Sequence, residues 1–108
     1  MLVIKGVNLH PSEVEAALLA SEDLAPHYQL IVDRRATLAR LVVEVEPSRA
    51  ALERAGGFAP EDPSLDGLRR RVTERLRERL GLAIEVTLVP PGAVPRSEGK
   101  AVRVVERG

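Results

Sequence analysis

The sequence predicts an α+β fold, a βαββαβ sandwich in which two helices cover one face of a mainly antiparallel sheet and a short strand follows at the C-terminus. Two observations lead to this prediction. Several short segments alternate apolar and polar residues with period two, which is typical of strands, and two longer segments repeat apolar residues at helical spacing. The length of 108 residues suits a single domain spanning 1–108.

The first strand and the first helix are expected near the N-terminus. An apolar, β-branched run predicts a strand over 2–9, and Gly6 inside it indicates a bulge or a close approach by a ligand or another backbone. Two signals then mark a helix start. Pro11 suits the first turn, whereas Ser12 and Glu15 have the spacing of a capping box, and the two signals place the first helical residue differently.

A β-hairpin is expected next. Alternation over 27–33 and again over 38–46 predicts two antiparallel strands joined by a turn at 34–37. Glu44 and Glu46 share one face of the second strand and could form a carboxylate pair. Because no metal-ligand pattern accompanies them, they are expected on the solvent face of the sheet.

A loop and a long helix follow the hairpin. Proline and glycine punctuate 47–64, which is expected to be a mobile surface loop with a short helix over 50–55. The segment 65–80 has an apolar stripe at helical spacing, and Gly81 is expected to cap this helix. Its opposite face is rich in arginine interleaved with glutamate. We interpret that face as solvated, with phosphate binding as the alternative.

The C-terminal part predicts a strand over 83–89 and a short edge strand over 102–105. Between them, the loop 95–103 contains Lys100, one of only two lysines beside fourteen arginines. An ammonium is a compact point charge with rotatable donors, unlike the planar guanidinium fork, and Gly99 gives the backbone freedom next to it. This pattern suits delivery of one positive charge to a developing anion, and a solvated surface turn is the alternative.

Composition excludes several classes of function. Sixteen basic and sixteen acidic residues balance, which predicts neither a nucleic-acid nor an anionic-membrane partner. There is no cysteine, the two histidines show no metal-ligand spacing, and no apolar run reaches the length of a bilayer span. A cytoplasmic protein without a metal site is therefore expected. The arginine-rich, cysteine-free composition hints at a thermophilic source.

Two separated motifs resemble one known family. The segments MLVIKGVNLHPSEVE over 1–15 and VPRSEGKAVR over 94–103 together resemble the C-terminal domain of phenylacetate–CoA ligase, an AMP-forming, adenylate-forming enzyme. The resemblance implies a two-step ligation, in which a carboxylate attacks the α-phosphate of ATP and the thiol of coenzyme A then displaces AMP. It also implies a large N-terminal domain that holds ATP-Mg and the acid, against which the small C-terminal domain rotates between the steps.

The resemblance matches five residues to positions of the family's motifs. Lys100 matches the adenylation lysine, Gly99 the glycine before it, and Arg103 the arginine three residues after it. Gly6 matches a glycine on the strand that lines the pantetheine channel in the thiolation pose. Lys5 matches a basic position beside that glycine and receives no firm role.

The resemblance also implies a partner, because no glycine-rich phosphate loop occurs in these residues. We expect the chain alone to bind neither ATP-Mg nor coenzyme A and to be inactive without an N-terminal adenylate-forming domain, supplied in cis or in trans. The alternative is a stand-alone small-molecule-sensing or dimerisation module without catalysis, for which a homodimer is expected. In that case Lys100 is a surface residue and Gly6 a bulge.

Overall fold

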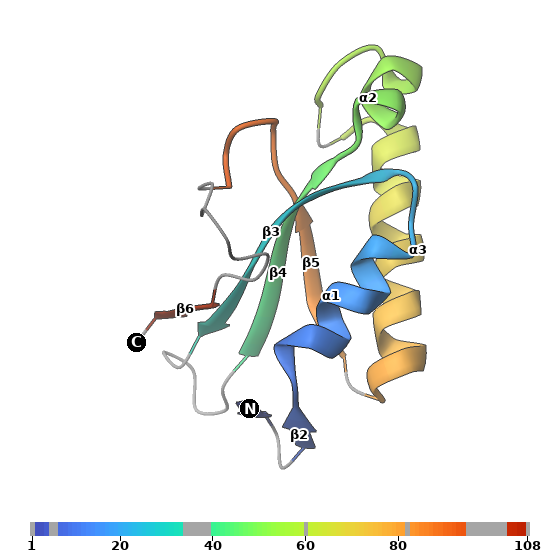
Figure 1. Ribbon diagram of the computed structural model, residues 1–108. Helices are drawn as coiled ribbons and strands as arrows, with labels where there is room; N and C mark the ends of the chain where they lie inside the picture. Colours follow the sequence, from blue (N-terminus) through green and yellow to red (C-terminus); the bar gives the residue numbers. More distant parts are fainter. Residues whose placement is uncertain are drawn as a thin grey trace.

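The computed structural model describes residues 2–4, 7–33, 40–59, 61–81, 83–94 and 104–107, and Figure 1 shows their arrangement. Within these ranges the elements in chain order are β1 (Leu2–Ile4), β2 (Val7–Leu9), α1 (Pro11–Leu19), β3 (Leu24–Asp33), β4 (Arg40–Pro47), α2 (Arg49–Ala55), α3 (Pro63–Leu80), β5 (Glu85–Leu88) and β6 (Val104–Arg107).

The main sheet has the strand order β5-β4-β3-β6. The hairpin of β3 and β4 is antiparallel, from Asp33 opposite Arg40 to Leu24 opposite Pro47. Strand β5 runs parallel to β4, and β6 runs parallel to β3. The α+β class is confirmed, but the sheet is mixed rather than mainly antiparallel. Helices α2 and α3 carry the chain from the end of β4 back to the start of β5, and such a crossover permits a parallel neighbour.

The N-terminal segment differs from the single strand expected over 2–9. Strands β1 and β2 pair with each other in a separate two-stranded antiparallel sheet. Ile4 pairs with Val7, which leaves two residues between the strands, the length of a tight hairpin connection. The alternation of apolar residues does not distinguish one long strand from two short ones, and this is why the sequence-based prediction was wrong here.

Helices α1 and α3 cover one face of the main sheet, as expected (Figure 1). The core lies between them and the sheet, and Ile84, which precedes β5, and Val86 and Leu88 of β5 are 2%, 4% and 8% exposed. The remaining buried residues of this core are Val14, Ala17, Leu18, Leu24, Tyr28, Leu30, Val32, Leu41, Val43, Val45, Ala51, Leu65, Leu68, Val72 and Leu76.

The helix ends follow local chemistry. Helix α1 begins at Pro11 with His10 as its N-cap, so the proline signal is the correct one of the two. Helix α3 begins at Pro63, two residues before the expected start, and the Asp62 side chain accepts a hydrogen bond from Ser64 N at 2.8 Å. Gly81 ends α3 with φ 70°, the left-handed cap that was predicted.

The segment expected to be a loop over 47–64 contains α2 and the start of α3. Ser48 is the N-cap of α2, and its hydroxyl accepts from Ala51 N at 3.1 Å. The short helix predicted at 50–55 is therefore present, one residue longer at its start. The mobility of the remaining residues of 47–64 stays a prediction.

Candidate functional site

The face of the main sheet opposite the helices buries charged groups. Side chains alternate along a strand, and Leu30 and Val32 of β3 point into the helix-covered core, so Ile31 and Asp33 point the other way. Ile31 and Asp33 are only 2% and 4% exposed, and Glu46 of β4 is 2% exposed. The expectation of a plain solvent face is therefore wrong for Glu46. The described chain after β5 turns toward this side of the sheet, away from the helices (Figure 1), whereas β6 is the edge strand next to β3.

Glu46 holds the chain where it leaves β5. The backbone N–H of Val94 donates to Glu46 Oε2 at 3.2 Å, and the bond is buried. Val94 itself is 3% exposed. Val94 is the last described residue before the predicted lysine loop, so this bond ties the start of that loop to the end of β4.

The other end of the same face is also polar. Arg40 Nη2 lies 3.4 Å from Asp33 Oδ2, and Arg40 Nη1 lies 3.7 Å from Glu85 Oε2. Between the two ends, Gln29 Nε2 donates to Glu44 Oε1 at 2.5 Å. The helix-free face thus carries paired polar groups across β3, β4 and β5, which sequence alternation alone does not reveal.

All five sequence-predicted site residues, Lys5, Gly6, Gly99, Lys100 and Arg103, lie outside the described residues. The structure instead describes the residues on either side of them. Ile4 and Val7 flank the first pair, and Val94 and Val104 flank the segment that carries the other three. Val104 pairs with Leu30 in the parallel ladder of β6 and β3.

The residues that flank the two motifs lie at different places in the fold. The hairpin of β1 and β2 lies beyond the lower end of the main sheet, at the start of α1, whereas the turn after β5 lies at the upper end (Figure 1). Glu46, near the end of β4, bonds to Val94 at that upper end. The hairpin that flanks the first motif is thus far from Val94, which precedes the second motif, whereas β6, which follows the second motif, lies toward the lower end of the sheet (Figure 1).

Tyr28 is a buried polar residue on the helix-covered face. Its side chain belongs to the core, and its hydroxyl makes no hydrogen bond within the described part of the chain. Burial chiefly, and then the nearby Glu15 carboxylate, raises the pKa of Tyr28 well above its ordinary value. Glu15 is near enough to act on the pKa of Tyr28, but its carboxylate does not satisfy the buried hydroxyl. A neutral, enclosed phenol of this kind is structural.

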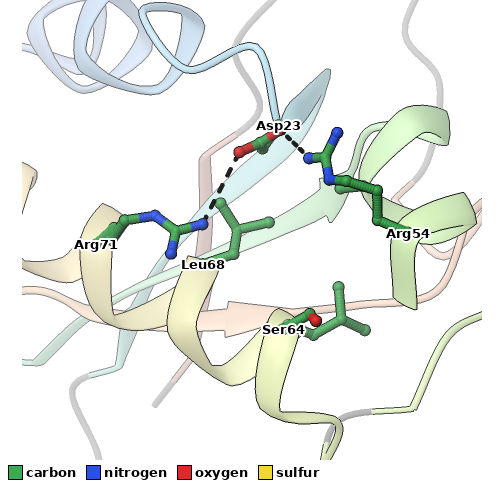
Figure 2. Close-up of a pocket in the computed structure, with 7 residues that line it drawn as sticks. Asp23, Arg54, Ser64, Leu68 and Arg71 are labelled. Carbon is green, nitrogen blue, oxygen red and sulfur yellow. Dashed lines mark hydrogen bonds and ion pairs between the residues drawn. The ribbon is translucent and has the colours of Figure 1, made fainter.

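A cavity of about 230 Å³ lies where α2 and α3 meet the segment before β3. Figure 2 shows Asp23 between two arginines, Arg54 of α2 and Arg71 of α3. Arg54 Nη2 donates to Asp23 Oδ1, and Arg71 Nη2 lies 3.8 Å from Asp23 Oδ2. Both arginine side chains are largely exposed, so each pair contributes at most about 1 kcal/mol. Their role is to join three elements, and no sequence signal linked positions so far apart.

The arginine face of α3 is partly neutralised by its own helix. Arg69 and Arg70 each lie 3.0 Å from a carboxylate oxygen of Asp66. This pairing supports the interpretation of a solvated face. Within the described residues, no three metal-ligating side chains come together, and no helix is both long and apolar enough to cross a bilayer.

Comparison with known proteins identifies the family. Residues 6–107 match the family model of the AMP-binding enzyme C-terminal domain. The chain belongs to this family, and the resemblance to the C-terminal domain of phenylacetate–CoA ligase is confirmed.

Curated relatives support the same family. The chain is 40% identical over 111 residues to a phenylacetate–CoA ligase of Thermus thermophilus and 40% identical over 110 residues to one of Escherichia coli. The alignments cover 97% and 98% of this chain but 25% and 23% of those enzymes. The chain thus spans about a quarter of the length of these relatives.

Solved structures share the fold. A domain of phenylacetate–CoA ligase from Bacteroides vulgatus superposes with a TM-score of 0.79 at 28% identity, covering 99% of this chain and 93% of that one. A 2-hydroxyisobutyryl-CoA ligase, in complex with 2-HIB-AMP and CoA, superposes with a TM-score of 0.80 at 28% identity, covering 98% of this chain and 21% of that one.

Proposed function

We propose that the chain is the lid domain of an AMP-forming acyl–CoA ligase similar to phenylacetate–CoA ligase. It works against an N-terminal domain that holds ATP, Mg²⁺ and the carboxylic acid. The observation that supports this most strongly is the family match over 6–107, which includes Gly6, Lys100 and Arg103. The described residues bring no three metal ligands together.

In the first step, an oxygen of the substrate carboxylate attacks the α-phosphorus of ATP. The bond from that phosphorus to the bridging oxygen breaks, and pyrophosphate leaves with the bond's electron pair. Negative charge concentrates on the oxygens in line with the attack, and a placed cation stabilises it best where water is excluded. The ammonium of Lys100 supplies this cation, and Gly99 and Arg103 shape and hold the segment that carries it.

In the second step, the sulfur of coenzyme A attacks the acyl carbon of the adenylate. The thiol proton passes to solvent, the bond from the acyl carbon to the phosphate oxygen breaks, and AMP leaves. Gly6 lines the channel for the pantetheine arm, where a side chain would obstruct the thiol. Lys5 lies beside it in sequence and has no assigned role.

The family resemblance implies two separate poses of the lid, one for each motif. Four residues of chain join Lys100 to Val104 on the edge of the main sheet, so the two Cα atoms lie at most about 14 Å apart. The hairpin that flanks Gly6 lies beyond the lower end of the sheet (Figure 1). Rotation of the lid would present first one motif and then the other to a fixed site on the partner domain.

Complementation tests this function. The 108-residue chain alone should give no ATP–pyrophosphate exchange, because its described residues form no phosphate cradle. Adding the N-terminal domain of a phenylacetate–CoA ligase that lacks its own lid should restore exchange dependent on the acid. Robust exchange by the chain alone would disprove its dependence on a partner, and a stable homodimer that restores nothing would favour the sensing or dimerisation module.

A further inference from the structure

Glu46 is a buried acid that the ligase chemistry proposed above does not itself use. Its side chain is 2% exposed near the end of β4. Burying a carboxyl group is costly unless hydrogen bonds satisfy its oxygens. One such bond comes from the backbone N–H of Val94, at 3.2 Å. The buried acid therefore contacts the chain immediately before the segment 95–103.

Neighbouring bonds make this contact part of a rigid connection. Val89 N donates to Val45 O at 3.0 Å, so the end of β5 is tied to β4. Ala93 N donates to Pro90 O at 3.0 Å across a turn with Gly92 at φ 85°, a type II pattern with proline before glycine. Val94 then bonds to Glu46, the residue after Val45. Val45 and Glu46, two consecutive residues of β4, thus bond to Val89 before the turn and to Val94 after it.

The far end of the same segment is fixed as well. Val104 opens β6 and pairs with Leu30 in the middle of the main sheet. The nine residues 95–103 therefore span two points on one sheet, one held by a strand ladder and the other by the Glu46 side chain. The contact through the Glu46 carboxylate is the one of the two that a single side-chain substitution alters.

We propose that Glu46 is a positioning residue for Lys100. It fixes where the lysine-bearing segment leaves the sheet, and through this it sets where the ammonium arrives in the adenylation pose. The inference rests on the proposed function, in which Lys100 must be delivered accurately. A displacement of about 1 Å can cost a reaction about 100-fold.

The first measurement uses the chain alone and no ligase activity. Native-state hydrogen exchange of the Val94 amide should become about tenfold faster in Glu46→Ala, the effect of losing one hydrogen bond. Glu46→Gln keeps an oxygen of similar reach but a weaker acceptor, so its exchange rate should lie between those of the wild type and Glu46→Ala. Glu44→Gln is the matched control on the same strand, because its carboxylate bonds to Gln29, and it should leave Val94 unchanged.

The second measurement uses the chain combined with the N-terminal ATP-binding domain. Glu46→Ala should slow adenylation by about 10- to 100-fold, while thioester formation from supplied acyl-adenylate stays near the wild-type rate. Glu46→Gln should recover part of the loss, and Glu44→Gln should match the wild type. If Glu46→Ala does not fold, the comparison of Glu46→Gln with Glu44→Gln decides both measurements.

The two measurements separate the possible failures. Unchanged Val94 exchange in both Glu46 variants would overturn the anchoring role. Faster exchange with unchanged adenylation would overturn the link to Lys100, and equal loss of both half-reactions would show a merely structural role. If instead Lys100→Ala leaves adenylation intact, the proposed function itself fails, whatever Val94 shows.

Discussion

The main sheet buries polar side chains on both of its faces, Glu46 and Asp33 on the helix-free face and Tyr28 on the helix-covered face. Glu46 has a backbone donor in Val94, and Tyr28 has no partner within the described part of the chain. A buried polar group without a partner costs about 1–3 kcal/mol, whereas a satisfied one is close to neutral or stabilising. The two residues should therefore respond to substitution in opposite directions.

Tyr28→Phe removes the unsatisfied hydroxyl and keeps the ring in the core. We expect the free energy of unfolding at pH 7 to stay unchanged or to rise by about 1 kcal/mol. Urea unfolding of both proteins measures it. A loss of more than about 1 kcal/mol would mean that the hydroxyl makes a stabilising bond after all.

The same residue predicts a dependence on pH. Burial and Glu15 raise the pKa of Tyr28 in the folded chain, so the unfolded chain releases this proton first. The contribution of Tyr28 to stability is full below the ordinary tyrosine pKa of about 10 and is lost as the pH rises above it. Urea unfolding from pH 8 to pH 11 should show the wild type losing stability relative to Tyr28→Phe only above about pH 10. A constant difference across this range would contradict the raised pKa.

At the scale of elements, helix ends decide much of the architecture. Gly81 ends α3 at φ 70°, and nothing lies within 4 Å of a Cβ built there. Gly67 sits inside the same helix, where a Cβ would meet only the flexible end of Arg71 at 3.4 Å. The first glycine is needed for its backbone angle, and the second weakens the helix it occupies.

Substituting alanine at the two positions should therefore have opposite effects. Gly81→Ala should lower the free energy of unfolding by about 1 kcal/mol, because alanine disfavours the left-handed conformation. Gly67→Ala should raise it by about 1 kcal/mol through better helix propensity. Thermal and urea unfolding of the two variants checks the signs, and equal signs would contradict the cap geometry.

Helices and strands were predicted correctly where the local sequence pattern allowed only one interpretation. The stripe of α3, the alternation of β5 and the hairpin of β3 and β4 follow directly from period and turn residues. The start of α3 was missed because Pro63 was interpreted as a breaker within 47–64, although proline directly after the acidic N-cap Asp62 is also a helix start. The parallel pairing of β5 with β4 and of β6 with β3 joins segments that are distant in the chain, and no local sequence pattern specifies it.

At the scale of the whole molecule, one core joins two layers of structure. Leu30 is fully buried at the centre of this core, in a strand flanked by β4 and β6, whereas Leu19 at the end of α1 is 50% exposed. Leu30→Ala should cost about 2–5 kcal/mol of unfolding free energy through lost burial and a cavity. Leu19→Ala, the same change at the surface, should stay within about 0.5 kcal/mol. Similar losses for both would contradict the position of the core.

The site was accessible to sequence analysis in part. Motif resemblance identified the family, and the family model and curated relatives confirm it. Glu46 was assigned to the solvent face because strand alternation separates two faces without saying what covers each of them. The cover comes from the chain after β5, whose contact with Glu46 joins positions 48 residues apart. Contacts of that range are fixed by the packed fold and leave no local signature.

The most direct test of the account compares the two half-reactions in Lys100→Ala, with the chain combined with the N-terminal domain of a phenylacetate–CoA ligase. Lys5→Ala, at the other lysine of the sequence, is the matched control for adenylation. In Lys100→Ala, adenylation should fall by about 10²–10³-fold, while thioester formation from supplied acyl-adenylate persists and Lys5→Ala adenylates normally. Equal loss of both half-reactions in Lys100→Ala, or no loss of either, would contradict the assignment of this lysine to the adenylation step.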